Sequence, residues 1–219
     1  MIKEEKKEMF GQLLIGKKMV NECQIEEALE IQKSNGKALG DVLIDLGHTT
    51  SDLIMSVLNI TRKTEQKLAR LFNASIGMLQ CTEQASLLNF IMTEAERILE
   101  SDMCNLFLID EEANEFKCFF ISNEETGKVR LPLSNGLAGY VAKASETINL
   151  ENAYQSPLFD PQLDNMLEYK TETVLCIPVK QRDNKVIGVL QVVNKKGKGQ
   201  FTSHDEWLFK SFAIFASNA

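Results

Sequence analysis

The stretch from Val186 to Phe212 constrains the fold of this chain more than any other. It opens with VIGVLQVV, a run of β-branched and apolar residues long enough for one buried strand. KKGKG then interrupts the pattern with charge and flexible backbone. A phenylalanine and the segment TSHDE follow, and a hydroxyl residue three positions before an acid is typical of a capped helix start. The stretch therefore predicts a buried strand, a short turn and a helix.

Two residue pairs fit this helix start. Thr202 can cap the helix with Asp205 at the third helical position, or Ser203 can do so with Glu206. Either choice places carboxylates at the positive end of the helix dipole. Because Lys195 leaves the strand nearby, we expect its ammonium group to bind Asp205 in a partly buried ion pair. That pair would join the end of the strand to the start of the helix.

The spacing of this corner also matches a known signature. It resembles the Asn-Lys…Phe…Asp-Glu motif in GAF domains of cyclic nucleotide phosphodiesterases and bacterial adenylyl cyclases. The residues that carry it are Asn194, Lys195, Phe201, Asp205 and Glu206. The upstream segments GLAGYVAKASETINLENAYQSPLFDP and YKTETVLCIPVK are similar to the same domains. The resemblance runs from about Thr82 to the end of the chain, and we assign residues 83–219 to this domain.

The residue pattern of this region predicts an α+β fold, an antiparallel sheet of about six strands flanked by helices. The expected strands are Met103–Ile109, Glu115–Ser122, Val129–Leu133, Thr147–Leu150, Val174–Lys180 and Lys185–Val193. The expected helices are Glu83–Glu100, Gly136–Ala144 and Asp205–Ala219. Asn152–Lys170 reads as a long irregular loop with two prolines. Loops of that length in a compact domain are commonly lids or binding loops.

The resemblance also implies a ligand site. In nucleotide-binding members the ligand lies between sheet and helices, beneath the long loop. Its phosphate meets backbone N–H groups at the start of a short helix, where the helix dipole favours an anion. The positions that match the family's contacts are Asn105, Ser122, Leu137, Ala138, Gly139, Asp160, Asp164, Leu167, Thr171 and Gln191. A purine cyclic nucleotide, cyclic AMP or cyclic GMP, is the ligand that these matches favour.

Three of these positions depart from the family pattern. Leu167 stands where binding members often have a hydroxyl, Gln191 where they have an acid, and Asn105 where they have a smaller hydroxyl residue. The two amides keep hydrogen-bonding capacity for a purine edge. The departures nevertheless keep a second hypothesis open, a structural dimerisation or protein-interaction module with no bound nucleotide.

Other ligands of the family need residues that the matching positions lack. A bilin needs a cysteine on the pocket loop, and none occurs between Tyr154 and Thr173. Haem needs an axial ligand, whereas His48 lies outside the domain and His204 at the predicted helix start. The free methionine sulfoxide reductases use loop cysteines, whereas the cysteines of this domain fall on predicted strands: Cys104, Cys118 and Cys176. No zinc-ligand spacing occurs, so we expect no metal site.

The sequence also argues against catalysis. Two histidines and no close pair of catalytic carboxylates leave little acid–base chemistry near neutral pH. We therefore expect a regulatory sensor rather than an enzyme. The last helix is apolar to its end, as expected for a chain that continues into an output domain.

The N-terminal residues 1–60 predict a small helical domain of two related units. Gly11, Leu14, Ile15, Ile25 and Leu29 recur 29 positions later as Gly40, Leu43, Ile44, Ile54 and Leu58. These units resemble the N-terminal domain of type II secretion and pilus ATPases, some of which bind cyclic di-GMP through an arginine in each unit. Met9 and Ala38 occupy the arginine positions here. We therefore expect the fold of that domain without its ligand, and a generic helical hairpin pair remains the alternative.

A single helix from Ser51 to Gln80 should follow, with residues 61–82 connecting the two domains. Leu68 and Leu71 lie on its apolar stripe, and such a helix commonly pairs with its copy, so we expect a homodimer. A plain connector is the alternative.

Net charge and hydropathy limit the partners and the location that we expect for this protein. A net charge of −7 argues against nucleic-acid binding by electrostatic attraction alone. No apolar run approaches the roughly 20 residues of a membrane helix, and the charged start MIKEEKKEMF lacks the apolar centre of a signal peptide. We expect a cytoplasmic protein that binds no membrane.

Overall fold

The computed structural model describes residues 10–120, 129–134, 136–197 and 199–218. The chain divides into two compact units, Met1–Lys67 and Leu68–Ala219. Helix α4 (Ser51–Gln80) contributes residues to both, as a single helix with the bounds predicted from the sequence. Within the described ranges, no helix combines the length and hydropathy needed to cross a membrane.

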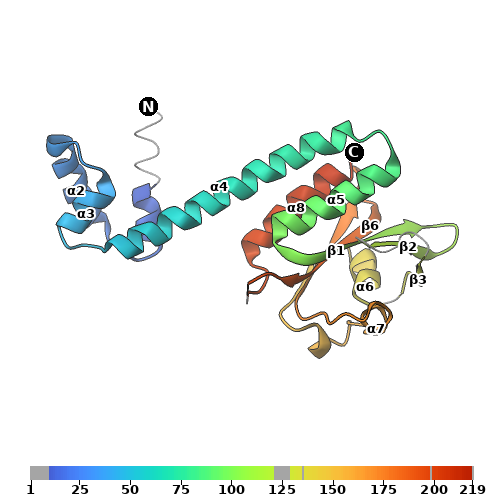
Figure 1. Ribbon diagram of the computed structural model, residues 1–219. Helices are drawn as coiled ribbons and strands as arrows, with labels where there is room; N and C mark the ends of the chain where they lie inside the picture. The colour runs from blue at the N-terminus through green and yellow to red at the C-terminus, as the bar shows by residue number, and fades with distance from the viewer. Residues whose placement is uncertain (1–9, 121–128, 135, 198, 219) are drawn as a thin grey trace. The chain divides into compact units, whose positions relative to one another are not determined.

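A six-stranded antiparallel sheet forms the centre of the second unit (Figure 1). Its strands are β1 (Ser101–Asp110), β2 (Glu115–Phe120), β3 (Arg130–Pro132), β4 (Ile148–Leu150), β5 (Val174–Lys180) and β6 (Val186–Lys195). They lie in the order β3-β2-β1-β6-β5-β4. The longest strands, β1 and β6, lie at the centre of the sheet, and both of their faces are covered. This burial explains the nearly continuous apolar run of β6. The predicted α+β class and strand set are confirmed.

One face of the sheet packs against α5 (Gln84–Leu99), α8 (Ser203–Ala216) and the last turns of α4. Gly77 on α4 allows a close approach here, since a Cβ atom at that position would lie 2.4 Å from Cζ of Phe90. Leu71 is buried in this core at 6% exposure. It therefore packs inside its own unit and is not available to a partner, which corrects the prediction that placed it in a dimer interface.

The opposite face is covered by α6 (Gly136–Ala144) and by the segment that follows β4. The sequence predicted an irregular loop over Asn152–Lys170, whereas the structure forms the short helices η1 (Ala153–Gln155) and α7 (Gln162–Leu167). The carboxylate of Asp160 accepts a hydrogen bond from the N–H of Gln162 and so satisfies the start of α7. A helix of fewer than two turns has too few residues for an apolar period, so the sequence pattern did not indicate it.

The first unit contains a helix over residues 10–16, α2 (Glu22–Asn35), α3 (Leu39–Asp45) and the first turns of α4. The predicted repeat reappears as a repeated contact. A Cβ atom at Gly11 would lie 3.3 Å from Cγ2 of Ile25, and one at Gly40 would lie 3.3 Å from Cγ2 of Ile54. Both repeats within the first unit therefore use a glycine to bring one helix close to an isoleucine of the next helix.

Candidate ligand-binding site

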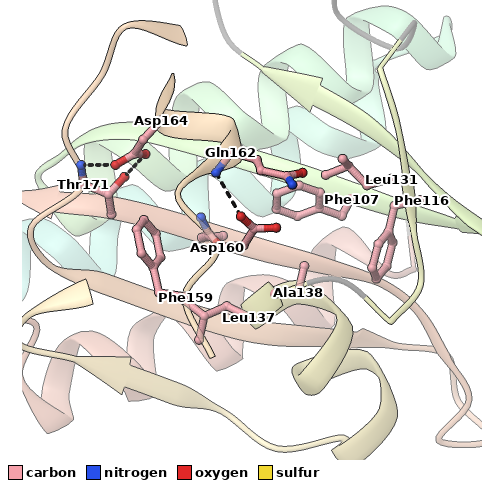
Figure 2. A pocket seen from close by; sticks show the side chains of 12 residues that line it. Phe107, Phe116, Leu131, Leu137, Ala138, Phe159, Asp160, Gln162, Asp164 and Thr171 are labelled. Atoms are coloured by element: carbon pink, nitrogen blue, oxygen red, sulfur yellow. Dashed lines mark hydrogen bonds between the residues drawn. The ribbon is translucent and has the colours of Figure 1, made fainter. Parts of the chain in front are cut away.

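The cavity of interest lies between the sheet and the α6–α7 side of the second unit. It encloses about 50 Å³, well below the few hundred Å³ of a typical ligand pocket. Its walls combine aromatic, aliphatic and polar side chains, as Figure 2 shows. The lining residues are Phe107, Phe116, Leu131, Gly136, Leu137, Ala138, Phe159, Asp160, Gln162, Asp164, Thr171 and Gln191.

The sheet supplies the floor of this cavity. Phe107 on β1 and Phe116 on β2 meet edge to face, with ring centroids 5.9 Å apart and planes at 63°. Gln191 on β6 is 8% exposed and lies directly opposite Asn105 on β1. Asn105 is 5% exposed, and its amide oxygen has no hydrogen-bond partner. The floor is thus apolar apart from the amide of Gln191, and Asn105 lies on the same face of the sheet outside the lining.

The loop from Pro161 to Thr171 closes the cavity through one buried carboxylate. Asp164 on α7 accepts hydrogen bonds from the N–H of Thr171 at 2.7 Å and from its hydroxyl at 2.6 Å (Figure 2). The hydroxyl of Tyr154 donates a third bond to the same carboxylate, at 2.9 Å. This bond to Asp164 is the main reason that the pKa of Tyr154 is raised. Three donors therefore hold the loop shut over the floor.

The start of α6 forms the third wall. Gly136 adopts φ +57°, a left-handed conformation that favours glycine, and places Leu137 and Ala138 on the cavity. Gly139 serves a different purpose, because a Cβ atom there would lie 2.5 Å from the carbonyl oxygen of Leu133. It allows α6 to pack against the residues after β3.

The structure brings most of the predicted site residues together. Six of them line the one cavity: Leu137, Ala138, Asp160, Asp164, Thr171 and Gln191. Asn105 lies on the cavity side of the sheet but outside the lining, and Gly139 lies behind it. Leu167 is the last residue of α7, and Ser122 falls outside the described residues.

Sequence reasoning missed the aromatic side chains of the site and three other lining positions. The additional lining residues are Phe107, Phe116, Leu131, Gly136, Phe159 and Gln162. A signal was present in the strands, because Phe107 has the same parity along β1 as Asn105, and residues two apart share a face. The two phenylalanines of the floor could have been found by extending the predicted face of each strand.

Asn194 joins residues 161–173, which we call the lid, to the end of β6. Its Oδ1 accepts hydrogen bonds from the N–H groups of Glu172 at 2.6 Å and Thr173 at 3.3 Å. Its Nδ2 donates to the hydroxyl of Tyr169 at 2.8 Å and to the carbonyl of Lys170 at 2.9 Å. The side chain thus uses its full hydrogen-bonding capacity on the segment that carries Thr171.

Lys195, the next residue, ties the same strand end to two helices. Its ammonium group lies 3.0 Å from Oδ1 of Asp205 on α8 and donates to the carbonyl of Leu99, the last residue of α5, at 2.7 Å. The predicted pair is confirmed, and so is the first of the two caps, with Thr202 and Asp205 in a capping box. The side chains of the pair are only 9% and 4% exposed, so the expectation of a partly buried pair is wrong.

The cysteines on strands are structural. Cys104, Cys118 and Cys176 are fully buried, and burial raises the pKa of each thiol, that of Cys118 to about 12. They therefore stay protonated near neutral pH and act as small apolar residues. In the portion of the chain that the structure describes, no cluster of metal-binding side chains occurs.

Comparison with known proteins agrees with this geometry. A family model described as the GAF domain matches residues 84–219. The dual 3',5'-cyclic-AMP and -GMP phosphodiesterase 11A of Takifugu rubripes is 33% identical over 134 residues, which make up 56% of this chain and 15% of that protein. The probable 3',5'-cyclic phosphodiesterase pde-5 of Caenorhabditis elegans is 36% identical over 141 residues, 59% of this chain and 19% of that protein. The chain therefore spans less than a fifth of these relatives.

Among solved structures, the GAF domain from the Acinetobacter phosphoenolpyruvate-protein phosphotransferase superposes with a TM-score of 0.60 at 26% identity. The match covers 70% of this chain and 91% of that one. Since the family model also matches more than half of the chain, this protein belongs to the GAF-domain family, whose members are generally ligand-binding regulatory modules.

Proposed function

We propose that this chain is a non-catalytic sensor that binds a purine cyclic nucleotide, cyclic AMP or cyclic GMP, in the cavity between α6 and the sheet. The observation that carries the proposal is the convergence of Leu137 and Ala138 at the start of α6, Gln191 on β6 and Thr171 from the loop on one enclosed space. Backbone N–H groups at the start of a helix suit a phosphate, and aromatic floor residues suit a flat base. Both curated relatives are named as cyclic nucleotide phosphodiesterases, and they match over their GAF segment.

Ligand entry requires the lid to open. The closed cavity of about 50 Å³ is too small for a nucleotide. Asp164 is held by Thr171 and Tyr154, so opening replaces these internal bonds by contacts with the ligand. Ligand binding and movement of the loop are then coupled, as a sensor requires.

The same small cavity favours a second candidate function. A small, largely apolar space in which both donors of Thr171 are already paired to Asp164 also suits a structural module that binds no nucleotide. In that case the domain would serve dimerisation or protein interaction through its helices.

Thermal unfolding in the presence of cyclic AMP and cyclic GMP separates the two functions. A ligand at 100 times its dissociation constant stabilises the folded state by about 2.7 kcal/mol, a clear rise in melting temperature. Ala138→Trp should fill the cavity and abolish that rise, while Tyr140→Trp on the exposed side of α6 serves as the matched control. No shift with either nucleotide at millimolar concentration favours the structural module instead.

A further inference from the structure

The connection between α3 and α4 places a histidine against the start of α2. Gly47 adopts φ +73° in this connection, and the N–H of His48 donates to the carbonyl of Leu43 at 2.9 Å. The side chain of His48 is 21% exposed. Its Nδ1 lies 3.2 Å from Nε2 of Gln24, and its Nε2 lies 2.9 Å from Oε2 of Glu27. The imidazole therefore contacts two side chains that lie about one turn apart on the same side of α2.

The cap of α2 fixes the orientation of the Gln24 amide. Oε1 of Gln24 accepts a hydrogen bond from the N–H of Asn21 at 2.9 Å, and Oδ1 of Asn21 accepts one from the N–H of Gln24 at 2.9 Å. These two bonds form a capping box. Since a backbone N–H can only donate, the amide oxygen of Gln24 must face Asn21, and its NH₂ group is turned towards the histidine.

The contacts of His48 fit one form of the ring. Nδ1 must accept a hydrogen bond, because the NH₂ group of Gln24 donates. Nε2 must carry the hydrogen, because the carboxylate of Glu27 accepts. A neutral imidazole with its hydrogen on Nε2 meets both conditions. The hydrogen bonds then run in one direction, from the N–H of Asn21 through Gln24 and His48 to Glu27.

Protonation reverses one link of this chain. Histidine is the side chain whose ordinary titration falls between pH 5 and 8. In the charged ring Nδ1 also carries a hydrogen, so that it opposes the NH₂ group of Gln24 with a second donor. Gln24 can offer its oxygen to the ring only by turning its amide, which withdraws that oxygen from the N–H of Asn21. The bond to Glu27 persists in both forms, so the link to Gln24 is the one that responds to the proton.

Other charges lie on the elements that meet at this point. Glu22 is in the first turn of α2, Asp52 is in the first turn of α4, and Asp45 at the end of α3 pairs with Lys37 at 2.7 Å. Among the described residues, Glu27 is the one carboxylate within ion-pair distance of the ring. The other charges act on the imidazole only through their field. They supply no acceptor that could replace the oxygen of the turned amide.

We propose that His48 is a pH-sensitive switch for the start of α2. The neutral ring holds Gln24 in the capping box, and the protonated ring releases the N–H of Asn21. Ile25 and Ala28 on α2 belong to the buried core of the first unit, so a loosened first turn reaches the helix that carries this core. The switch goes beyond the proposed function, because it needs no ligand in the second unit.

A nuclear magnetic resonance titration of the intact chain from pH 8 to pH 5 tests the switch. We expect the amide proton of Asn21 to move upfield with the same midpoint as the His48 ring. Its protection against exchange, corrected for the intrinsic rate, should fall about fivefold, as expected for the loss of one hydrogen bond. An Asn21 amide that stays constant while the His48 ring titrates overturns the proposal.

Two variants separate the switch from other titrating groups. His48→Gln keeps one donor and one acceptor without a titratable ring, so the Asn21 amide should stay constant from pH 8 to pH 5. Gln24→Glu offers one oxygen to Asn21 and another to the protonated ring, so the amide should keep its bond across the titration. An Asn21 amide that titrates in His48→Gln as in the parent assigns the change to another group and overturns the proposal. The titration of the parent decides alone should a variant not fold.

Discussion

At the scale of single residues, Lys195 and Asp205 show how burial changes the contribution that an ion pair makes to stability. Their side chains are 9% and 4% exposed, and removing one partner leaves the other charge buried. We expect Lys195→Met, which keeps the length of the side chain but not its charge, to lower the free energy of unfolding by about 3 kcal/mol. Urea denaturation of both proteins gives this difference directly.

Lys210→Met provides the control for that measurement. Lys210 pairs with Glu206 on the same helix, but its side chain is 51% exposed, so its loss should cost no more than about 0.5 kcal/mol. Equal changes in the free energy of unfolding for the two substitutions would show that burial of the Lys195 pair adds nothing to the cost of losing the lysine charge.

Tyr169 gives the protein a pH dependence in the alkaline range. Burial, together with the negative charge of Asp102, raises its pKa to about 12, against about 10 in an unfolded chain. Because the folded state holds this proton more tightly, the stabilisation is present below about pH 10 and is lost as the pH rises towards 12. Unfolding free energies of the parent should therefore fall more steeply over this range than those of Tyr169→Phe. Parallel curves would assign the alkaline loss to other groups.

At the scale of elements, strong patterns in the sequence predicted most of the fold. Residues 136–144 and 174–180 have the predicted bounds, because a glycine start and an uninterrupted apolar run leave little choice. Helix α7 was missed, since a single carboxylate at Asp160 and the closing of the cavity stabilise it rather than an apolar stripe. The aromatic floor was also missed, although strand parity places each phenylalanine on the cavity face. Only the contact between Phe107 and Phe116 depends on strand registry, which the whole sheet decides.

Two consecutive residues at the end of β6 connect elements that are distant in sequence. Asn194 makes four hydrogen bonds to the lid segment, and Lys195 binds α8 and the end of α5. Asn194 has φ +54°, which glycine also adopts freely. We therefore expect Asn194→Gly to remove the hydrogen bonds without backbone strain. It should lower the free energy of unfolding by about 2 kcal/mol and speed amide exchange at Glu172 and Thr173.

Asn184→Gly is the matched control, since Asn184 has φ +66° in the turn between β5 and β6. That change should leave exchange in residues 169–173 as in the parent. Unchanged exchange at Glu172 and Thr173 in Asn194→Gly would show that Asn194 does not hold the lid.

At the scale of the whole molecule, the N-terminal unit remains a predicted helical domain without a cyclic di-GMP site. Ala38, at an arginine position of the ATPase domains that the unit resembles, caps α3 without a side-chain hydrogen bond. Met9, at the other arginine position, lies outside the described residues. Guanidinium groups that would contact phosphate and guanine are thus replaced by apolar side chains. Calorimetry with cyclic di-GMP should detect no sub-micromolar binding, and a tight isotherm would show a different mode of recognition.

The α4 segment in the second unit carries an apolar stripe that its own unit does not cover. Leu68, Phe72, Ile76 and Leu79 follow the spacing of one helical face and are 40%, 65%, 42% and 78% exposed. Such a stripe is stabilised by a second copy of the same helix, so we expect a homodimer at micromolar concentration. Leu68→Glu with Phe72→Glu should give monomers in sedimentation without lowering the melting temperature of the second unit, because both residues are exposed. Tyr140→Glu, on the opposite side of the sheet, should stay dimeric, and a parent chain that sediments as a monomer would rule the interface out.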